Sequence, residues 1–244
     1  MRKKVNESIA WLLNSQKTGI DDGFASHYEL EVGWHASYPE VTGYIVPTLM
    51  KHYHATSNSS MRRSALSAAN WLLSIQNSTG SFYGRLADEN TPTPVVFNTG
   101  MIIFGLLSAY DETKNKRYLA AAEDAGSWLV GIQNADGSWT KFNTINGDCL
   151  HNYHSKVSWS LLELYKRTRC EKYLLSALSN LENCILHQEK NGWFNSTSLT
   201  KSMQQKPLLH FMAYTIRGLL ECGLILNSEK IINRANLSLS LIHI

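Results

Sequence analysis

Apolar residues recur at three- and four-residue steps along much of this chain. Tyr118, Ala121, Trp128 and Ile132 belong to one such stripe, with polar residues between them, and this is the pattern of a helix that buries one face. Other stretches, such as "GMIIFGLL" at Gly100–Leu107, are apolar on more than one side, as buried helices are. No run alternates for long as a strand does, so the pattern predicts an all-α protein with little β structure.

The two kinds of segment alternate because the sequence repeats. The phrase "WLLSIQNSTGSF" at Trp71–Phe82 returns as "WLVGIQNADGSW" at Trp128–Trp139, and looser copies begin at Trp11 and Asn183. The second kind of segment begins at Thr42, Thr99, Ser155 and Ala213. We therefore predict helical hairpins over residues 1–56, 60–113, 116–168 and 171–223, with the start of a fifth at 228–244.

A single hairpin cannot bury its own apolar face, so the hairpins must stack. We expect one domain, residues 1–244, with amphipathic helices outside and buried helices inside, at 42–53, 99–110, 156–165 and 213–220. We also expect Asn58 to cap a helix, Gly80, Gly137 and Gly192 to end helices, and Trp71 and Trp128 to be buried between hairpins. Four complete hairpins predict an incomplete or open ring, so a second copy or a partner chain would cover the apolar flanks at Val5–Leu13 and Ile231–Ile244.

The motif Q-x-x-x-G-S-aromatic stands at Gln76–Phe82 and Gln133–Trp139. It resembles the QW repeat of terpenoid cyclases and protein prenyltransferase β subunits. The resemblance implies an α/α-toroid, in which the glutamine and glycine close the helix end and the aromatic ring packs against the next hairpin. The ring is also similar to the toroids of six-hairpin glycosidases, N-acyl-glucosamine epimerases and polysaccharide lyases, and Gly33–Leu49 is similar to uncharacterised toroid proteins of bacterial surface-polysaccharide loci.

These families imply two chemistries. Squalene-type cyclases protonate their substrate with a D-x-D-D motif, and these 244 residues contain none. Prenyltransferase β subunits hold zinc with an aspartate, a nearby cysteine and a later histidine, for which Asp148, Cys149 and His210 are the candidates. However, Asp148 and Cys149 are adjacent, where the family spaces them by one. We therefore expect no metal and no other cofactor, with zinc as the alternative.

Composition limits the classes of binding partner and the cellular location that we expect. The chain is 43% hydrophobic, which suffices for a sizeable core, and its net charge is only +3. Because the basic residues are dispersed, nucleic acid is not an expected partner. The start of the chain, "MRKKVNESIAWLL", has no long apolar segment, and no stretch is expected to reach the length of a membrane span. The four cysteines form no C-x-x-C pair, so we expect reduced thiols and a cytoplasmic location.

Aligning the repeats on their buried helices groups polar residues from distant parts of the chain. Tyr44, Met101, Lys156 and Tyr214 share one position, and Glu40, Phe97, Asn152 and His210 lie one turn earlier. Asn98, Tyr153 and His154 lie in the neighbouring register, and the preceding loops add Trp34, Asp148 and His151. The N-termini of the inner helices gather at one mouth of such a ring, so we expect these residues to converge there. Their mixture of aromatic faces and polar groups suits a sugar better than an isoprenoid.

Proton abstraction beside a uronic carboxylate needs a base, an acid on the other side of the sugar ring and a cation that stabilises the enolate-like intermediate. The predicted catalytic residues are His210, Tyr214, His154, Glu40 and Asp148. The predicted substrate-binding residues are Trp34, Tyr44, Asn98, His151, Tyr153, Lys156 and Arg217. Hydrolysis would instead need two carboxylates, and Glu40 and Asp148 are the available pair.

Each of these residues also has a purely structural interpretation. Tyr44 and Tyr214 would be core tyrosines, His210 and Glu40 would cap helices, and Arg217 would form a salt bridge. We predict a carbohydrate-active enzyme, either lyase, epimerase or hydrolase, that acts on an acidic or amino-sugar glycan. The alternatives are an isoprenoid-handling toroid of the cyclase or prenyltransferase kind, and a scaffold or binding module without catalytic activity.

Overall fold

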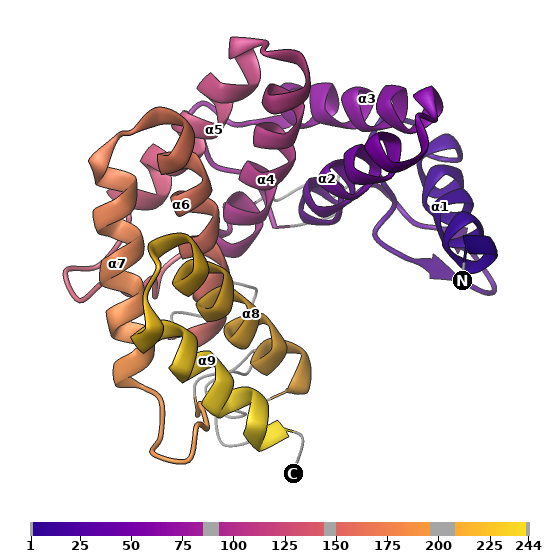
Figure 1. Ribbon diagram of the computed structural model, residues 1–244. Helices are drawn as coiled ribbons and strands as arrows, with labels where there is room; N and C mark the ends of the chain where they lie inside the picture. The colour runs from indigo at the N-terminus through magenta and orange to yellow at the C-terminus, as the bar shows by residue number, and fades with distance from the viewer. Residues whose placement is uncertain (1, 85–92, 144–149, 196–207, 243–244) are drawn as a thin grey trace. The chain divides into compact units, whose positions relative to one another are not determined.

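A computed structural model describes residues 2–84, 93–143, 150–195 and 208–242, most of which are helical (Figure 1). The helices in this part of the chain are α1 (Arg2–Lys17), α2 (Pro39–Thr56), α3 (Ser59–Ile75), α4 (Val96–Thr113), α5 (Lys116–Gly131), α6 (Ser155–Thr168), α7 (Glu171–Leu186), α8 (Leu209–Leu226) and α9 (Glu229–Ile242), with a 3-10 turn, η1 (Asn152–His154), before α6. Two short strands, β1 (Tyr28–Glu29) and β2 (Gly33–Trp34), pair antiparallel. The prediction of an all-α fold is confirmed.

The described chain divides into two compact units. The first comprises Met1–Pro94 and Met101–Ala125, and the second comprises Val95–Gly100 and Gly126–Ile244. Within the first unit, α2 packs against α3. Within the second, α6 packs against α7 and α8, and α8 packs against α9 (Figure 1).

The helices are of two kinds, as the pattern predicts. The amphipathic α3 buries Met61, Ala65, Ala68 and Leu72, which recur along one face, and the Asn58 side chain caps its start by accepting from the Ser60 N–H. In contrast, α6 buries eight of its residues from Ser155 to Leu164. The buried helices α2, α4 and α8 begin about one turn before the predicted starts, because helical hydrogen bonds already join Thr42 to Tyr38, Thr99 to Val95 and Met212 to Leu208.

The repeated glutamine joins successive odd-numbered helices. In each repeat its side-chain amide donates to a backbone carbonyl oxygen of the next odd-numbered helix: Gln16 to Ser64 at 3.1 Å, Gln76 to Ala121 at 2.8 Å, Gln133 to Ser176 at 3.0 Å and Gln188 to Arg234 at 2.8 Å. The amides of Gln76 and Gln133 also donate within their own turns, to the carbonyl oxygens of Gly80 and Gly137. The glutamine therefore stabilises both the turn and the stacking of the helices.

The repeated glycine does not end its helix, contrary to the prediction. Helix α5 ends at Gly131 and Gly137 lies in the turn that follows. Gly137 has a φ of +82°, and a Cβ there would overlap the carbonyl oxygen of Ser179 on α7. The glycine is therefore required where the turn passes against the next helix. The aromatic residues that follow are fully enclosed: Phe24, Phe82, Trp139 and Phe194 each have 0% exposure.

One further expectation is met in part and another is wrong. Trp71 is 8% exposed and therefore buried, whereas Trp128 is only half-buried and packs against the Phe142 ring. Within the described residues, Leu209–Leu226 is long and apolar enough to cross a membrane, with a mean hydropathy of 1.3, so the expectation that no stretch reaches this length is wrong. This helix is α8, which packs against α6 and α9 and is 39% buried.

Candidate functional site

The start of α8, η1 with the preceding His151, and the start of α6 lie together in the second unit and carry half of the predicted site residues. Their rings are in mutual contact and enclose one buried lysine. We call this group the aromatic–histidine cluster; its members are Phe97, His151, Tyr153, His154, Lys156, His210, Phe211 and Tyr214. Phe97 comes from the first turn of α4. This turn belongs to the second unit, whereas the rest of α4 belongs to the first.

A close helix crossing positions the cluster. A Cβ at Gly218 of α8 would lie 2.5 Å from the backbone nitrogen of Lys156, so only glycine allows α8 to approach the start of α6 this closely. The Ser155 hydroxyl fixes the crossing by donating to the carbonyl oxygen of Thr215 at 3.1 Å. Tyr214 lies one turn before Gly218, so this approach brings its ring beside Lys156.

Lys156, Tyr214 and His210 form the polar part of the cluster. The Lys156 Nζ lies 3.8 Å from the centroid of the Tyr214 ring and 5.7 Å from that of Phe97. Lys156 is only 3% exposed, and an ammonium group in such a place is attracted to the electron-rich faces of aromatic rings. The His210 ring lies 4.2 Å from the Tyr214 ring, and it is solvent-exposed while Tyr214 is half-buried. A histidine, a tyrosine and a cation thus adjoin at the surface of the second unit.

His154 lies deeper in the cluster. It is 1% exposed, and neither of its ring nitrogens has a hydrogen-bond partner among the described residues. Burial lowers its pKa well below the usual value, and the neighbouring His151 lowers this pKa further. The side chain of Asn152 is also buried without a hydrogen-bond partner in the described chain. Unsatisfied buried polar groups cost about 1–3 kcal/mol each and are few in native proteins, so these two side chains have the polar atoms to bind a polar ligand or ordered water.

Tyr153 is the centre of the aromatic packing. Its ring lies 4.7 Å from His151, 4.8 Å from Phe211 and 5.1 Å from Phe97. Because Tyr153 is only 2% exposed, its position indicates that it supports its neighbours rather than forming an open surface for a substrate. Phe211 belongs to the cluster although the sequence did not identify it as a site residue. Its place next to His210 in the aligned repeats is the signal that indicates it.

Three other predicted residues lie in the first unit, and Asn98 directly follows Phe97 in the second. Trp34, Glu40 and Tyr44 belong to the first unit. There Glu40 is in the first turn of α2, which fits the helix-capping interpretation, and Tyr44 is half-buried one turn later. Asn98 is 1% exposed, in the first turn of α4.

Arg217 is on the exposed side of α8. Its guanidinium lies 5.2 Å from the Trp159 ring and its Nε lies 3.7 Å from the Glu221 carboxylate, which matches the salt-bridge interpretation. Asp148 and Cys149 lie outside the described residues. The zinc set and the carboxylate pair for hydrolysis therefore stay predictions.

The family of the chain follows from its sequence. The profile of the squalene-hopene cyclase C-terminal domain matches residues 35–217, and this stretch includes the Q-x-x-x-G turns at Gln76 and Gln133 and the whole aromatic–histidine cluster. The chain is an α/α-toroid protein, and it belongs to the squalene-hopene cyclase C-terminal domain family. No curated protein sequence matches it significantly.

Solved structures with the same fold include carbohydrate enzymes. An unsaturated glucuronyl hydrolase specific for heparin has a TM-score of 0.74 at 14% identity, over 95% of this chain and 64% of that one. A sugar epimerase from a ruminal bacterium has a TM-score of 0.74 at 14% identity, over 96% and 67%. A GH76 α-mannanase of Bacteroides thetaiotaomicron has a TM-score of 0.70 at 17% identity, over 91% and 62%. This chain spans less than two thirds of the length of the hydrolase and the mannanase, and the similarity establishes the fold.

Proposed function

We propose that this protein is a carbohydrate-active enzyme that acts on an acidic glycan through proton abstraction, with His210 and Tyr214 as the acid and base and Lys156 as the supporting cation. The observation that carries the proposal is the position of the Lys156 Nζ, 3.8 Å from the centroid of the Tyr214 ring, which also adjoins the His210 ring. Carbohydrate enzymes among the proteins of the same fold support the substrate class.

The chemistry is a β-elimination at a uronic acid unit. One of His210 and Tyr214 takes the proton from the carbon beside the carboxylate, and the electron pair left behind forms the ring carbon–carbon double bond. The glycosidic bond breaks as the leaving oxygen takes a proton from the other residue. A cation beside the tyrosine favours its ionised form and also stabilises negative charge that develops on the substrate carboxylate. Lys156 is the residue of the cluster with that charge.

The arrangement favours a lyase over an epimerase. His210 and Tyr214 project from one helix, one turn apart, with ring centroids separated by 4.2 Å. Both groups therefore approach a bound sugar from the same side, and not from the two sides expected from the sequence; this suits removal of a proton and a leaving group from one face of the ring. Epimerisation needs groups on opposite faces, and hydrolysis needs two carboxylates. The arrangement therefore supports epimerisation and hydrolysis less well than it supports elimination.

The test is an assay of the purified protein on a panel of uronic-acid, amino-sugar and neutral glycans. The lyase reaction predicts an increase in ultraviolet absorbance from the unsaturated product on at least one uronic-acid glycan. It also predicts that Tyr214→Phe and His210→Ala abolish this increase, while Tyr165→Phe on α6 and His187→Ala after α7 do not. Water-dependent cleavage without an unsaturated product would indicate a hydrolase. Absence of reaction and binding across the panel would reject the carbohydrate proposal.

An isoprenoid-handling protein is the second candidate, and the family assignment over residues 35–217 favours it. The Tyr153 ring stacks on Phe211 and meets Phe97 edge to face, and aromatic rings of this type stabilise a carbocation. Incubation with squalene and prenyl diphosphates, followed by product analysis, distinguishes the two functions. A cyclised or transferred isoprenoid product together with inactivity on all glycans would establish this candidate and exclude the first.

A further inference from the structure

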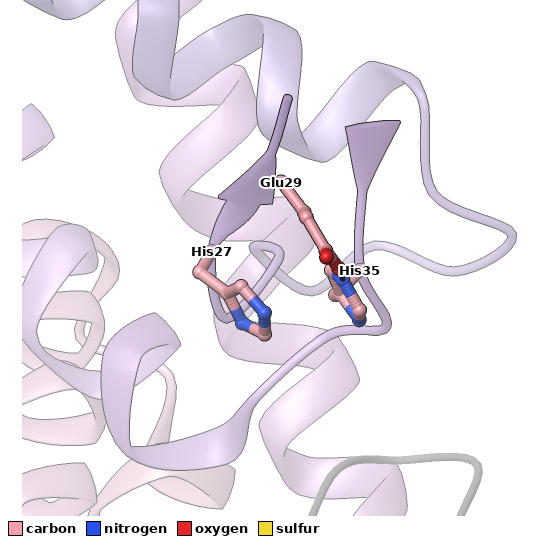
Figure 2. A group of neighbouring side chains, drawn as sticks. All are labelled: His27, Glu29 and His35. Atoms are coloured by element: carbon pink, nitrogen blue, oxygen red, sulfur yellow. Dashed lines mark hydrogen bonds and ion pairs between the residues drawn. The ribbon is translucent and has the colours of Figure 1, made fainter. Parts of the chain in front are cut away.

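The β1–β2 hairpin of the first unit carries two histidines and a glutamate on one face. The pairing of Tyr28 with Trp34 and of Glu29 with Gly33 sets the register, and the His35 N–H donates to the His27 carbonyl oxygen at 3.1 Å. His27 and His35 therefore lie opposite each other. Because side chains alternate along a strand, Glu29 projects on the same side as His27. Figure 2 shows the Glu29 carboxylate directed at the His35 ring.

The other face of the hairpin is aromatic and rests on α1. The Trp11 ring lies 4.6 Å from the Trp34 ring and 5.3 Å from the Tyr28 ring, and Tyr28 and Trp34 are 5.0 Å apart. An isolated two-stranded hairpin is marginally stable in water. These contacts, together with the bridge between Ala25 and Ser37 at its base, hold the hairpin in place and so hold the histidine face in a fixed arrangement.

We propose that His27, Glu29 and His35 form a binding site for a divalent transition-metal ion, with Zn²⁺ as its representative. One ligand atom from each residue lies within 4.8 Å of the other two (Figure 2). A tetrahedral zinc ion holds its ligand atoms roughly 3.3 Å apart, given bonds of about 2.0 Å. The side chains of His27 and Glu29 are exposed, so small rotations can close the remaining gap. Two imidazoles and one carboxylate are a known zinc donor set that leaves a fourth position for water.

Two contacts prepare the ligands for a metal. The Ser26 Oγ lies 2.8 Å from the His27 Nδ1; a proton on Nδ1 that is donated to this oxygen leaves Nε2 free to coordinate. Such hydrogen bonds orient metal-binding histidines. The His35 Nε2 lies 2.9 Å from the Glu29 Oε2. A metal ion that replaces the proton between them keeps both atoms as neighbours and adds His27 as the third ligand.

The first unit supplies a matched control. His54 Nε2 lies 3.2 Å from the Glu112 Oε2, so it forms a histidine–carboxylate pair like that of His35 and Glu29. No second histidine joins this pair in the three-residue groups found among the described residues. If zinc binding requires two histidines in addition to the carboxylate, the hairpin binds zinc and the His54–Glu112 pair does not.

The experiment is isothermal titration calorimetry of the full chain with Zn²⁺, repeated for His27→Ala, His35→Ala, Glu29→Gln, Ser26→Ala and His54→Ala. We expect one ion per chain, at least about tenfold weaker binding for the three ligand variants, a smaller loss for Ser26→Ala and no change for His54→Ala. Circular dichroism checks that each variant is folded. The visible spectrum of the Co²⁺-loaded protein should change in His27→Ala.

Three results would overturn the assignment. They are no zinc binding by the wild-type chain at micromolar concentration, binding that survives both His27→Ala and His35→Ala, and binding that is lost in His210→Ala instead. The last result would place the ion at the alternative set predicted from the sequence. None of these results depends on the reaction proposed for the aromatic–histidine cluster.

Discussion

The side-chain amide of Gln133 donates to the carbonyl oxygen of Ser176 on α7, 3.0 Å away, and so joins one repeat to the next. The same amide donates to the Gly137 carbonyl oxygen at 2.9 Å within its own turn. One side chain therefore satisfies two backbone acceptors in different elements. The glutamine recurs in the sequence because each copy makes this connection.

Gln133→Ala should lower the free energy of unfolding by about 1–3 kcal/mol, because it removes two hydrogen bonds to partly buried carbonyl groups, of which the Gly137 oxygen keeps the Asn180 amide as a donor. Urea unfolding followed by circular dichroism measures the change. Asn236→Ala, at an exposed position of α9, is the control and should change stability by less than about 0.5 kcal/mol. Equal effects of the two substitutions would show that the glutamine does not stabilise the stack.

Gly137→Ala should destabilise the protein by at least about 2 kcal/mol, because it combines a positive φ with an overlap against Ser179. Gly131→Ala is the matched control. Gly131 is the last residue of α5, and no atom lies within 4 Å of an added Cβ there. This control should be neutral or stabilising by up to about 1 kcal/mol. Thermal unfolding of both variants tests the prediction, which fails if Gly137→Ala unfolds at the wild-type temperature.

Stability should fall below neutral pH because of His154. Burial lowers its pKa in the folded protein, so the unfolded chain binds a proton at a higher pH than the folded protein does. The contribution is fully present above the ordinary histidine pKa of about 6.5 and is lost as the pH falls below it. Between about pH 6.5 and about pH 5.5, the wild type should lose up to about 1.4 kcal/mol more than His154→Gln does. Parallel urea titrations measure this, and identical pH slopes would contradict it.

Self-association is expected from apolar side chains on the first and last described helices. Val5 and Trp11 on α1 are 44% and 52% exposed, and Leu237 and Leu239 on α9 are 36% and 38% exposed. Sedimentation velocity over a wide concentration range should show a dimer or larger species, which Leu239→Asp weakens if α9 takes part. A monomer at every concentration would reject this expectation.

The repeats were predictable because their signals are local. Apolar periodicity, the Q-x-x-x-G turn and the Asn58 cap are each set by a few neighbouring residues, and the helices follow them. The role of Gly137 was misassigned because it depends on contact with α7, which sequence spacing does not show. The hairpin was missed because each strand has only two residues, too few for alternation to stand out. The H-x-E sequence at His27–Glu29 was the available signal for its metal-binding face.

Alignment of the repeats predicted much of the site. It placed Lys156, His210 and Tyr214 near each other, because equivalent positions of stacked hairpins lie at the same end of their helices. It could not show that His154 is buried without hydrogen-bond partners among the described residues, since that depends on the packing of Trp139 and Tyr153 around its ring. It also could not distinguish an Arg217 that binds substrate from one that contacts Glu221.

The most direct test of the proposed catalytic unit is the rate of unsaturated product formation by Lys156→Met and Lys172→Met, on the acidic glycan that the wild type cleaves fastest. Lys172 is the matched control, because its Nζ lies 5.1 Å from the centroid of the Tyr173 ring, on α7. We expect Lys156→Met to lose at least about 100-fold in rate while its melting temperature stays equal or rises, since an apolar side chain replaces a buried charge. Lys172→Met should keep the wild-type rate. A Lys156→Met protein that is folded and cleaves the glycan as fast as the wild type would contradict the account.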